Sequence, residues 1–205
     1  MLCAEKIGKR FGARVVLRGL SFEVLPRNAV AIVGANGAGK STLLKIVCGL
    51  MAASVGKIAW RENGEISGRE LGQMCGLAAP DAPLPRELTA LENLEFLARL
   101  RGLNCERETL LAHLDKWHLR ARANDFAGDL SSGLRARLGL AAATLHSPKI
   151  LLLDEPGANL DSDGRALLQN ALLAQRQIGI TLVATNDARE ADLCDARIEV
   201  GANRN

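Results

Sequence analysis

Short apolar runs alternate with stretches of helical periodicity along the chain, and this alternation predicts an α/β domain. Ile150–Leu153 and Ile180–Ala184 lack a regular polar alternation, as expected for central parallel strands that are covered on both faces. The first two predicted strands resemble a peripheral, antiparallel pair instead. The strands that we predict are Leu2–Ile7, Leu20–Val24, Ala29–Val33, Lys57–Trp60, Met74–Ala78, Ile150–Leu153, Ile180–Ala184 and Arg197–Val200.

Between Pro80 and Pro148 the strand signals stop and helical patterns take over. Thr89 and Glu92 have the spacing of a capping box, which predicts that a helix begins there. The expected helices run from Thr89 to about Arg101, along an apolar stripe of Leu110, Leu111, Leu114 and Trp117, and from Ser132 to His146. We therefore expect a single domain over residues 1–205, with a helical subdomain inserted at about residues 80–148.

Composition and charge narrow the class of protein. Of the 205 residues 48% are hydrophobic and 24% are charged, as in ordinary globular domains. A net charge of +3 and 3% aromatic residues provide neither a basic surface nor a stacking platform, so we expect no nucleic-acid partner. No apolar run approaches the ~20 residues that span a bilayer, and no signal peptide opens the chain. The five cysteines are scattered without a Cys-x-x-Cys pair, which favours a reducing, cytoplasmic setting.

One segment carries a specific chemical signal. Gly34-Ala35-Asn36-Gly37-Ala38-Gly39-Lys40-Ser41 fits the phosphate-binding pattern G-x-x-x-x-G-K-[ST] at every fixed position, and Thr42 follows it. It also stands between an apolar strand and a plausible helix, Ser41–Cys48, as this loop requires. The glycines let backbone N–H groups point inward at phosphates, beside the positive end of the helix. We expect Lys40 to reach the β- and γ-phosphates of ATP and the Ser41 hydroxyl to bind Mg²⁺.

A second signal follows the apolar run Ile150–Leu153, which ends in Asp154 and Glu155. A central strand that ends there would bring Asp154 near the phosphate loop, where a carboxylate can hold Mg²⁺ directly or through water. Glu155 would then polarise a water molecule for in-line attack on the γ-phosphate. Two acids after a strand are usually a solvated strand end, but a phosphate loop in the same chain favours the functional interpretation.

Leu130-Ser131-Ser132-Gly133-Leu134 lies just upstream of the apolar run Ile150–Leu153. Together with the phosphate loop, it is one of five features in chain order that resemble the ATP-binding subunits of ABC transporters. The family signature Leu-Ser-Gly-Gly-Gln is matched at Leu130, Ser131 and Gly133, with Ser132 where the first glycine is usual and Leu134 where glutamine is usual. Asp154-Glu155-Pro156 resembles the family's Walker B segment, and Asn159-Leu160-Asp161 resembles its D-loop. Phe11 stands where the family places an aromatic residue that stacks on adenine. The resemblance covers essentially the whole chain.

The resemblance implies a P-loop NTPase fold with a mainly parallel central sheet, peripheral antiparallel strands and a helical insertion. It implies that a second cassette, identical or different, pairs head to tail with this one around two ATP molecules, each held by one phosphate loop and the partner's signature. ATP would close this dimer and hydrolysis would open it. Membrane permease subunits would receive the motion and hold the cassette at the inner face of the cell membrane. Ser131 and the N–H of Gly133 suit a γ-phosphate, although Ser131 also suits an ordinary helix N-cap.

Two departures from the family pattern bear on hydrolysis. The family usually has a histidine after the last long strand, and here Asn186 stands at that switch position. Asparagine forms hydrogen bonds but is shorter and carries no proton charge. The family's glutamine at the entry to the helical region is also missing, since Ala79-Pro80-Asp81 stands near that place. Asp81 is a candidate oxygen donor near Mg²⁺. These changes put the hydrolysis rate in question and leave ATP and Mg²⁺ binding supported.

Four functions compete for this sequence. The first is the ATP-hydrolysing motor of a membrane transporter, which Glu155 favours. The second is a degenerate cassette that binds ATP or regulates a partner with little hydrolysis, which Asn186 favours. A soluble P-loop kinase would leave the signature unexplained, and an ABC ATPase of translation or DNA repair usually has two cassettes or a long coiled coil.

The transported substrate is not legible in the chain, because permease subunits would bind it. The chain ends shortly after Val200 and carries Leu88-Thr89-Ala90-Leu91-Glu92-Asn93-Leu94, and this compactness resembles the haem-exporter subunits of cytochrome c biogenesis.

Overall fold

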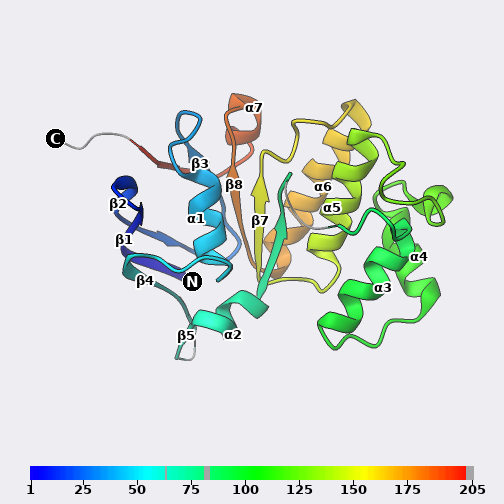
Figure 1. The fold of residues 1–205 in the computed structure, drawn as a ribbon, viewed down its shortest axis with the longest axis horizontal. Helices are drawn as coiled ribbons and strands as arrows, with labels where there is room; N and C mark the ends of the chain where they lie inside the picture. The colour runs from blue at the N-terminus through cyan, green and yellow to red at the C-terminus, as the bar shows by residue number, and fades with distance from the viewer. Residues whose placement is uncertain (63, 81–83, 202–205) are drawn as a thin grey trace.

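A computed structural model describes residues 1–62, 64–80 and 84–201 of the chain (Figure 1). Two sheets make up its β structure: an antiparallel sheet of order β2-β1-β4-β5 and a parallel sheet of order β6-β7-β8-β3-β9. The antiparallel strands are β1 (Leu2–Phe11), β2 (Arg14–Val24), β4 (Val55–Arg61) and β5 (Glu65–Ser67). The parallel strands are β3 (Ala29–Val33), β6 (Cys75–Ala78), β7 (Ile150–Asp154), β8 (Ile180–Ala184) and β9 (Ala196–Glu199). The predicted P-loop NTPase fold is therefore confirmed.

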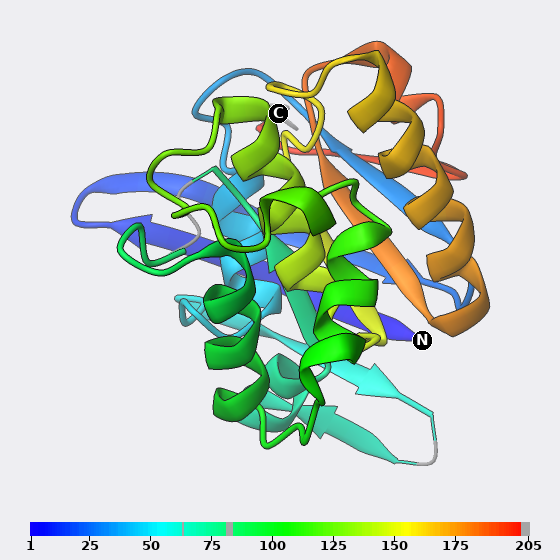
Figure 2. The same cartoon turned by 90° about the vertical axis from the view of Figure 1, so that its right-hand side faces the viewer.

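Helices cover both faces of the parallel sheet. On one face α1 lies between this sheet and the antiparallel strands, and α5 and α6 lie on the other face (Figure 1). Turning the molecule by 90° brings the helices of residues 90–178 in front of the sheet (Figure 2). The helices are α1 (Lys40–Val47), α2 (Gly68–Gln73), α3 (Ala90–Leu100), α4 (Arg107–Asp115), the 3₁₀ turn η1 (Arg120–Arg122), α5 (Ser132–Thr144), α6 (Ser162–Ile178) and α7 (Ala188–Ala191).

The central strands explain why their sequences lack regular polar alternation. In β7, Ile150 and Leu152 pack into the core on the α1 side, whereas Leu151 and Leu153 pack into the core beneath α5 and α6. Side chains alternate between the faces of a strand, so a strand that is covered on both faces needs apolar residues at every position. The carboxyl end of this buried strand carries Asp154, which places a carboxylate at the edge of the sheet.

The chain between β6 and β7 is helical, and its first long helix begins as the sequence predicts. Thr89 Oγ1 accepts a hydrogen bond from the backbone N–H of Glu92 at 3.2 Å, and Glu92 Oε2 accepts one from the N–H of Thr89 at 2.8 Å. Both contacts of the capping box are therefore present. Trp117 is buried but lies two residues beyond the end of α4, so the expected apolar stripe is only partly helical.

Several boundaries differ from the expected ones. β1 and β2 continue four and six residues further toward their shared turn than the expected Leu2–Ile7 and Leu20–Val24, because they form one long hairpin. α5 ends at Thr144 rather than His146. In the part of the chain that the structure describes, no helix is both long and apolar enough to cross a membrane.

Candidate functional site

The phosphate loop joins the end of β3 to the start of α1, and glycine is required at two of its positions. Gly34 has φ +155°, and a Cβ there would lie 2.3 Å from the carbonyl oxygen of Val200. Gly39, the N-cap of α1, has φ +107°, and a Cβ there would lie 2.8 Å from the side chains of Val16 and Leu17. A side chain at either position would force this backbone away from its neighbours. The loop is therefore shaped by tertiary contacts as well as by its own sequence.

Lys40, the first residue of α1, turns back over the phosphate loop. Its side chain is almost fully buried, and its Nζ donates hydrogen bonds to the carbonyl oxygen of Gly34 and to Oδ1 of Asn186, both at 2.9 Å. The same Nζ lies 3.8 Å from Oε1 of Glu155. The ammonium group that the loop aims at phosphates is thus already held by three oxygen atoms of the chain.

Asn186 joins three parts of the site that are distant in the sequence. Its Nδ2 donates to Oδ1 of Asn36 in the phosphate loop at 2.5 Å and to Oε1 of Glu155 at 3.1 Å. Its backbone N–H donates to the other carboxylate oxygen of Glu155, Oε2, at 3.2 Å. Since its Oδ1 accepts from Lys40, the carboxamide uses its donor and acceptor atoms together. The switch position therefore holds both oxygens of Glu155 in a defined orientation.

Asp154 and Glu155 stand at the end of β7, as expected. Asp154 is 7% exposed, and its Oδ1 is buried with no hydrogen-bond partner among the described residues. Burying an unpaired carboxylate oxygen is unfavourable, so this atom fits a cation ligand. Mg²⁺ prefers oxygen ligands and usually takes one or two from the protein together with phosphates and water. Asp154 and the exposed Ser41 supply such oxygens, and the described residues contain no cluster of three or more His, Cys, Asp or Glu that would form another metal centre.

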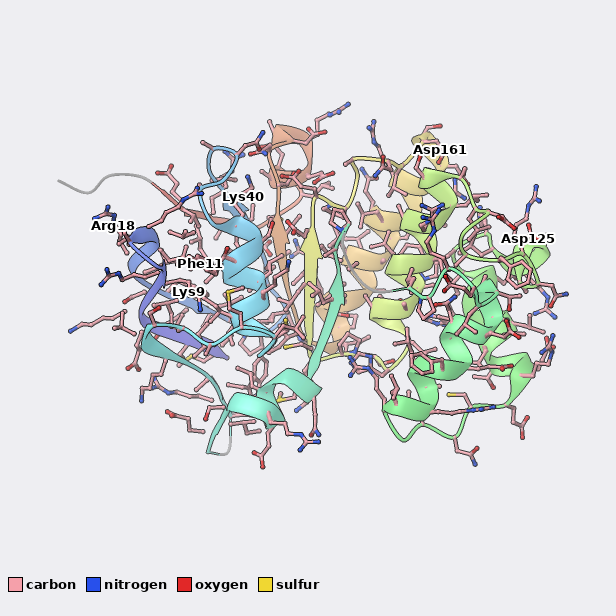
Figure 3. All side chains as sticks on the ribbon, in the orientation of Figure 1. Lys9, Phe11, Arg18, Lys40, Asp125 and Asp161 are labelled. Carbon is pink, nitrogen blue, oxygen red and sulfur yellow. The ribbon has the colours of Figure 1, made fainter. Side chains whose placement is uncertain are left out.

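Phe11, the residue that the sequence predicts to stack on adenine, lies at the tip of the β1–β2 hairpin. Phe11 pairs with Arg14 across this hairpin, and its ring is 47% exposed. Lys9 Nζ lies 5.1 Å from the centroid of the ring, within the range of a cation–π contact. A Cβ at Gly37 would lie 3.7 Å from the Arg14 guanidinium, so the tip borders the phosphate loop. Phe11 and Lys40 accordingly lie on the same side of the molecule (Figure 3).

The signature and D-loop residues lie together, but away from the phosphate loop of their own chain. Ser131 caps α5 and accepts from the N–H of Leu134 at 3.3 Å, and Asp161 caps α6 and accepts from the N–H of Gly164 at 2.8 Å. The buried Arg137 of α5 donates to Asp161 at 2.6 Å, which ties the two segments together. The Gly164 N–H and this guanidinium hold the pKa of Asp161 below its usual value. In Figure 3 Asp161 and Lys40 stand on opposite sides of the central sheet.

The other signature positions complete this surface. Leu130 is buried, and Leu134 packs against the core beneath α5 and α6. A Cβ at Gly133 would lie 2.9 Å from the carbonyl oxygen of Asn159. The chain therefore keeps α5 and the D-loop in close contact at Gly133. Ser132 follows Ser131 at the first position of α5 and lines a cavity described next.

A cavity of about 320 Å³ opens onto the carboxylates from the helical side. It lies between the end of β6, α5 and the end of β7, and its lining includes Ala79, Pro80, Arg86, Ser132 and Glu155. Ala79 and Pro80 are the described part of the segment where a glutamine is usual in the family. The candidate oxygen donor Asp81 lies outside the described residues.

The order of these elements matches a known family. The model of the ABC transporter family matches residues 17–158 of this chain. The chain belongs to the ABC transporter family. Two solved structures of ABC cassettes have the same fold: an ATP-binding subunit of an ABC transporter (27% identity, TM-score 0.84, 98% of this chain and 85% of that one) and a dimeric, post-hydrolysis cassette bound to ADP and Pi (25% identity, TM-score 0.84, 98% and 94%).

Relatives of this ABC cassette are named as ATP-binding proteins. The linearmycin resistance ATP-binding protein LnrL of Bacillus subtilis (strain 168) is 32% identical over 202 residues, which are 95% of this chain and 64% of the relative. The Nod factor export ATP-binding protein I of Rhizobium leguminosarum bv. viciae is 34% identical over 205 residues, 97% of this chain and 65% of the relative. The lantibiotic transport ATP-binding protein SrtF of Streptococcus pyogenes is 31% identical over 91% of this chain and 80% of the relative. The chain thus spans just under two thirds of the length of the first two.

The structure of this ABC cassette brings together most of the residues expected at the nucleotide site. Contacts at the ends of β3, β7 and β8 join Asn36, Lys40, Glu155 and Asn186. Asp154 ends β7 directly before Glu155. The contact between Asn36 and Asn186 was not expected, since no local pattern links residues 150 positions apart. Glu190, which enters the same region from α7, carried no signal in the sequence.

Proposed function

We propose that this chain hydrolyses ATP as one half of a cassette dimer and drives a membrane transporter. The observation that carries the proposal is the position of Glu155. Asn186 holds both of its carboxylate oxygens, and the Lys40 ammonium that would contact the β- and γ-phosphates lies 3.8 Å away. A carboxylate held beside the phosphate site is the group that a general base in ATP hydrolysis requires.

Each residue then has a role in the reaction. The backbone N–H groups of residues 34–41 and the Nζ of Lys40 bind the phosphates, and Phe11 stacks on adenine. Ser41 and Asp154 would hold Mg²⁺, which neutralises charge on the phosphate oxygens when it is bound. Glu155 accepts a proton from the attacking water, while Asn186 keeps its carboxylate oriented. The amide of Asn186 replaces the family's histidine in this role.

The dimer is proposed because the chain's own signature cannot complete its site. Ser131 caps α5 and Gly133 lies in its first turn, whereas Lys40 begins α1 on the opposite face of the sheet, so a second cassette must present Ser131 and Gly133 to the γ-phosphate (Figure 1). A structural neighbour of this chain is a dimeric cassette bound to ADP and Pi, which supports this arrangement. We infer that ATP closes the pair and that hydrolysis opens it.

The partners and the location follow from the same proposal. Permease subunits would receive the motion through the helices between β6 and β7 and would hold the cassette at the inner face of the cell membrane. The related proteins are named for linearmycin resistance, Nod factor export and lantibiotic transport, so we assign no cargo to this chain. The haem-exporter subtype stays a prediction from the sequence.

A second candidate function is a cassette that binds ATP with little hydrolysis. Asn186 at the switch position and the apolar Leu134 in the signature favour it. Single-turnover hydrolysis by the wild type and by Glu155→Gln separates the two functions. The motor requires a wild-type rate well above that of the variant, whereas two equal rates near the uncatalysed background would refute hydrolysis by this chain. Sedimentation of Glu155→Gln with Mg-ATP tests the dimer.

A further inference from the structure

Glu190, on the short helix α7, extends its side chain to the turn that follows Glu155. A Cβ built at Gly157 would lie 2.1 Å from Glu190 Oε1, so the carboxylate rests directly against the backbone of that turn. Gly157 is buried and does not have a positive φ. A side chain at this position would therefore have to displace the Glu190 carboxylate, although the local backbone conformation does not itself call for glycine.

The same carboxylate also contacts the loop that carries Asn186. Burial raises the pKa of Glu190, whereas its polar partners, the Thr185 hydroxyl and the backbone N–H of Gly157, lower it. Thr185 is fully buried, and its Oγ1 also accepts the N–H of Asp187 at 2.9 Å. Glu190 thus lies between Gly157, two residues after the general base, and Thr185, one residue before Asn186.

The surroundings of Glu190 are unfavourable for a carboxylate, which indicates a specific role. Its Oε2 is buried with no hydrogen-bond partner among the described residues. The nearby carboxylates of Asp187 and Glu155 raise its pKa further. A half-buried carboxyl with one buried, unsatisfied oxygen beside like charges does not stabilise a fold by itself.

We propose that Glu190 is a positioning residue, which holds the Glu155–Pro156–Gly157 turn and the Thr185–Asn186 loop in one geometry. The inference rests on the proposed hydrolytic function. Glu190 does not touch the reacting atoms; it acts through the two loops that orient Glu155 and Asn186 toward each other. A small displacement of either loop would break the hydrogen bonds of 3.1 and 3.2 Å that hold the general base.

Single-turnover hydrolysis and ATP affinity give the first test. Glu190→Ala should lower the rate by about tenfold, a loss of about 1.4 kcal/mol in the transition state, and leave the ATP dissociation constant within about twofold. Glu190→Gln keeps an oxygen acceptor for Gly157 and Thr185 and should retain most of the rate. Asp192→Asn is the control, because Asp192 ends the same helix but pairs with Arg197. A wild-type rate in Glu190→Ala, or an equal loss in Glu190→Gln, would overturn the proposal.

Gly157→Ala tests the contact from the other side. Its Cβ would displace the carboxylate, so this variant should lose as much rate as Glu190→Ala, and the double variant should be no slower than either. Rate losses that multiply in the double variant would overturn the proposed contact.

Amide hydrogen exchange tests, without any hydrolysis, whether Glu190 holds the two loops together. In Glu190→Ala, peptides covering residues 156–160 and 185–187 should exchange faster together, while the peptide covering α1 stays as in the wild type. If the wild type hydrolyses no ATP but this exchange pattern appears, the proposed function fails and the positioning contact stands. Unchanged exchange in both loops would overturn the role of Glu190 whatever the hydrolysis rate.

Discussion

Replacing Lys40 should weaken ATP binding. The loss should be smaller than the number of contacts between Lys40 and the phosphates would suggest. The Lys40 ammonium donates two hydrogen bonds of 2.9 Å, to neutral oxygens of Gly34 and Asn186, and lies 3.8 Å from Glu155. ATP binding therefore exchanges these partners for phosphate oxygens. The affinity depends on the difference between the two sets of contacts.

The difference can be worked from typical hydrogen-bond strengths. A bond from an ammonium is worth about 1.5 kcal/mol with a neutral oxygen and about 3 kcal/mol with an anionic one, so two exchanges gain about 3 kcal/mol. Loosening the ion pair with the partly exposed Glu155 takes back at most about 1 kcal/mol. We therefore expect Lys40→Ala to weaken Mg-ATP binding by about 2 kcal/mol, or ~30-fold.

Titration calorimetry with Mg-ATP at 25 °C measures this change. Lys40→Met keeps most of the buried stem and should give the same loss, which separates charge from packing. Lys57→Ala is the control, because Lys57 is an exposed cation of β4 in the antiparallel sheet. A folded Lys40→Ala that binds ATP within threefold of wild type would refute the role of Lys40. A loss far beyond a thousandfold would refute the exchange argument.

Three other changes test the site and the fold. Glu155→Gln should slow hydrolysis at least about 100-fold with ATP affinity retained, and it should accumulate an ATP-bound dimer in sedimentation; monomer alone would count against the dimer. Asn186→His keeps the backbone N–H bond to Glu155 and should add a charge-assisted bond to the γ-phosphate that outweighs the lost amide contact, so we expect single-turnover hydrolysis to rise by about tenfold, about 1.4 kcal/mol; an unchanged rate would contradict a weakened switch. Burial, with Arg101 nearby, lowers the pKa of His146 to about 4, below that of an unfolded histidine. The stability that its neutral form contributes is thus complete above pH ~6.5 and declines as the pH falls toward ~4. Thermal melts at several pH values should show this decline in stability. His146→Leu should make the decline smaller.

The sequence was sufficient for features whose physical causes are local. The spacing of glycines and Lys40 in the phosphate loop, and the capping box at Thr89 and Glu92, each depend on residues within one or two turns of the chain. The continuous apolar run of β7 also predicted its covered position correctly, because burial on both faces constrains every residue of a strand. Each of the eight expected strands is present in the structure.

Weak local signals explain why β5 and α2 were not predicted; the longer helix α6 was not predicted either. β5 has three residues and α2 has six, so neither is long enough to show a hydrophobic period. The extensions of β1 and β2 contain many exposed positions and are strands because they pair with each other. The ends of β1 and β2 depend on how the two strands pair, and the sequence of one segment does not indicate that pairing.

Only the tertiary structure decided how the site residues contact one another. Asn186 meets Asn36 across 150 residues and holds both oxygens of Glu155, although the sequence alone indicated only that it occupies the switch position. Glu190 and Gly157 have no pattern that joins them, and their contact exists because β7 and β8 are neighbours in the parallel sheet. The residue types of the site are thus determined by local sequence, whereas their mutual geometry is determined by the order of strands in the sheet. That order depends on the packing of the whole chain.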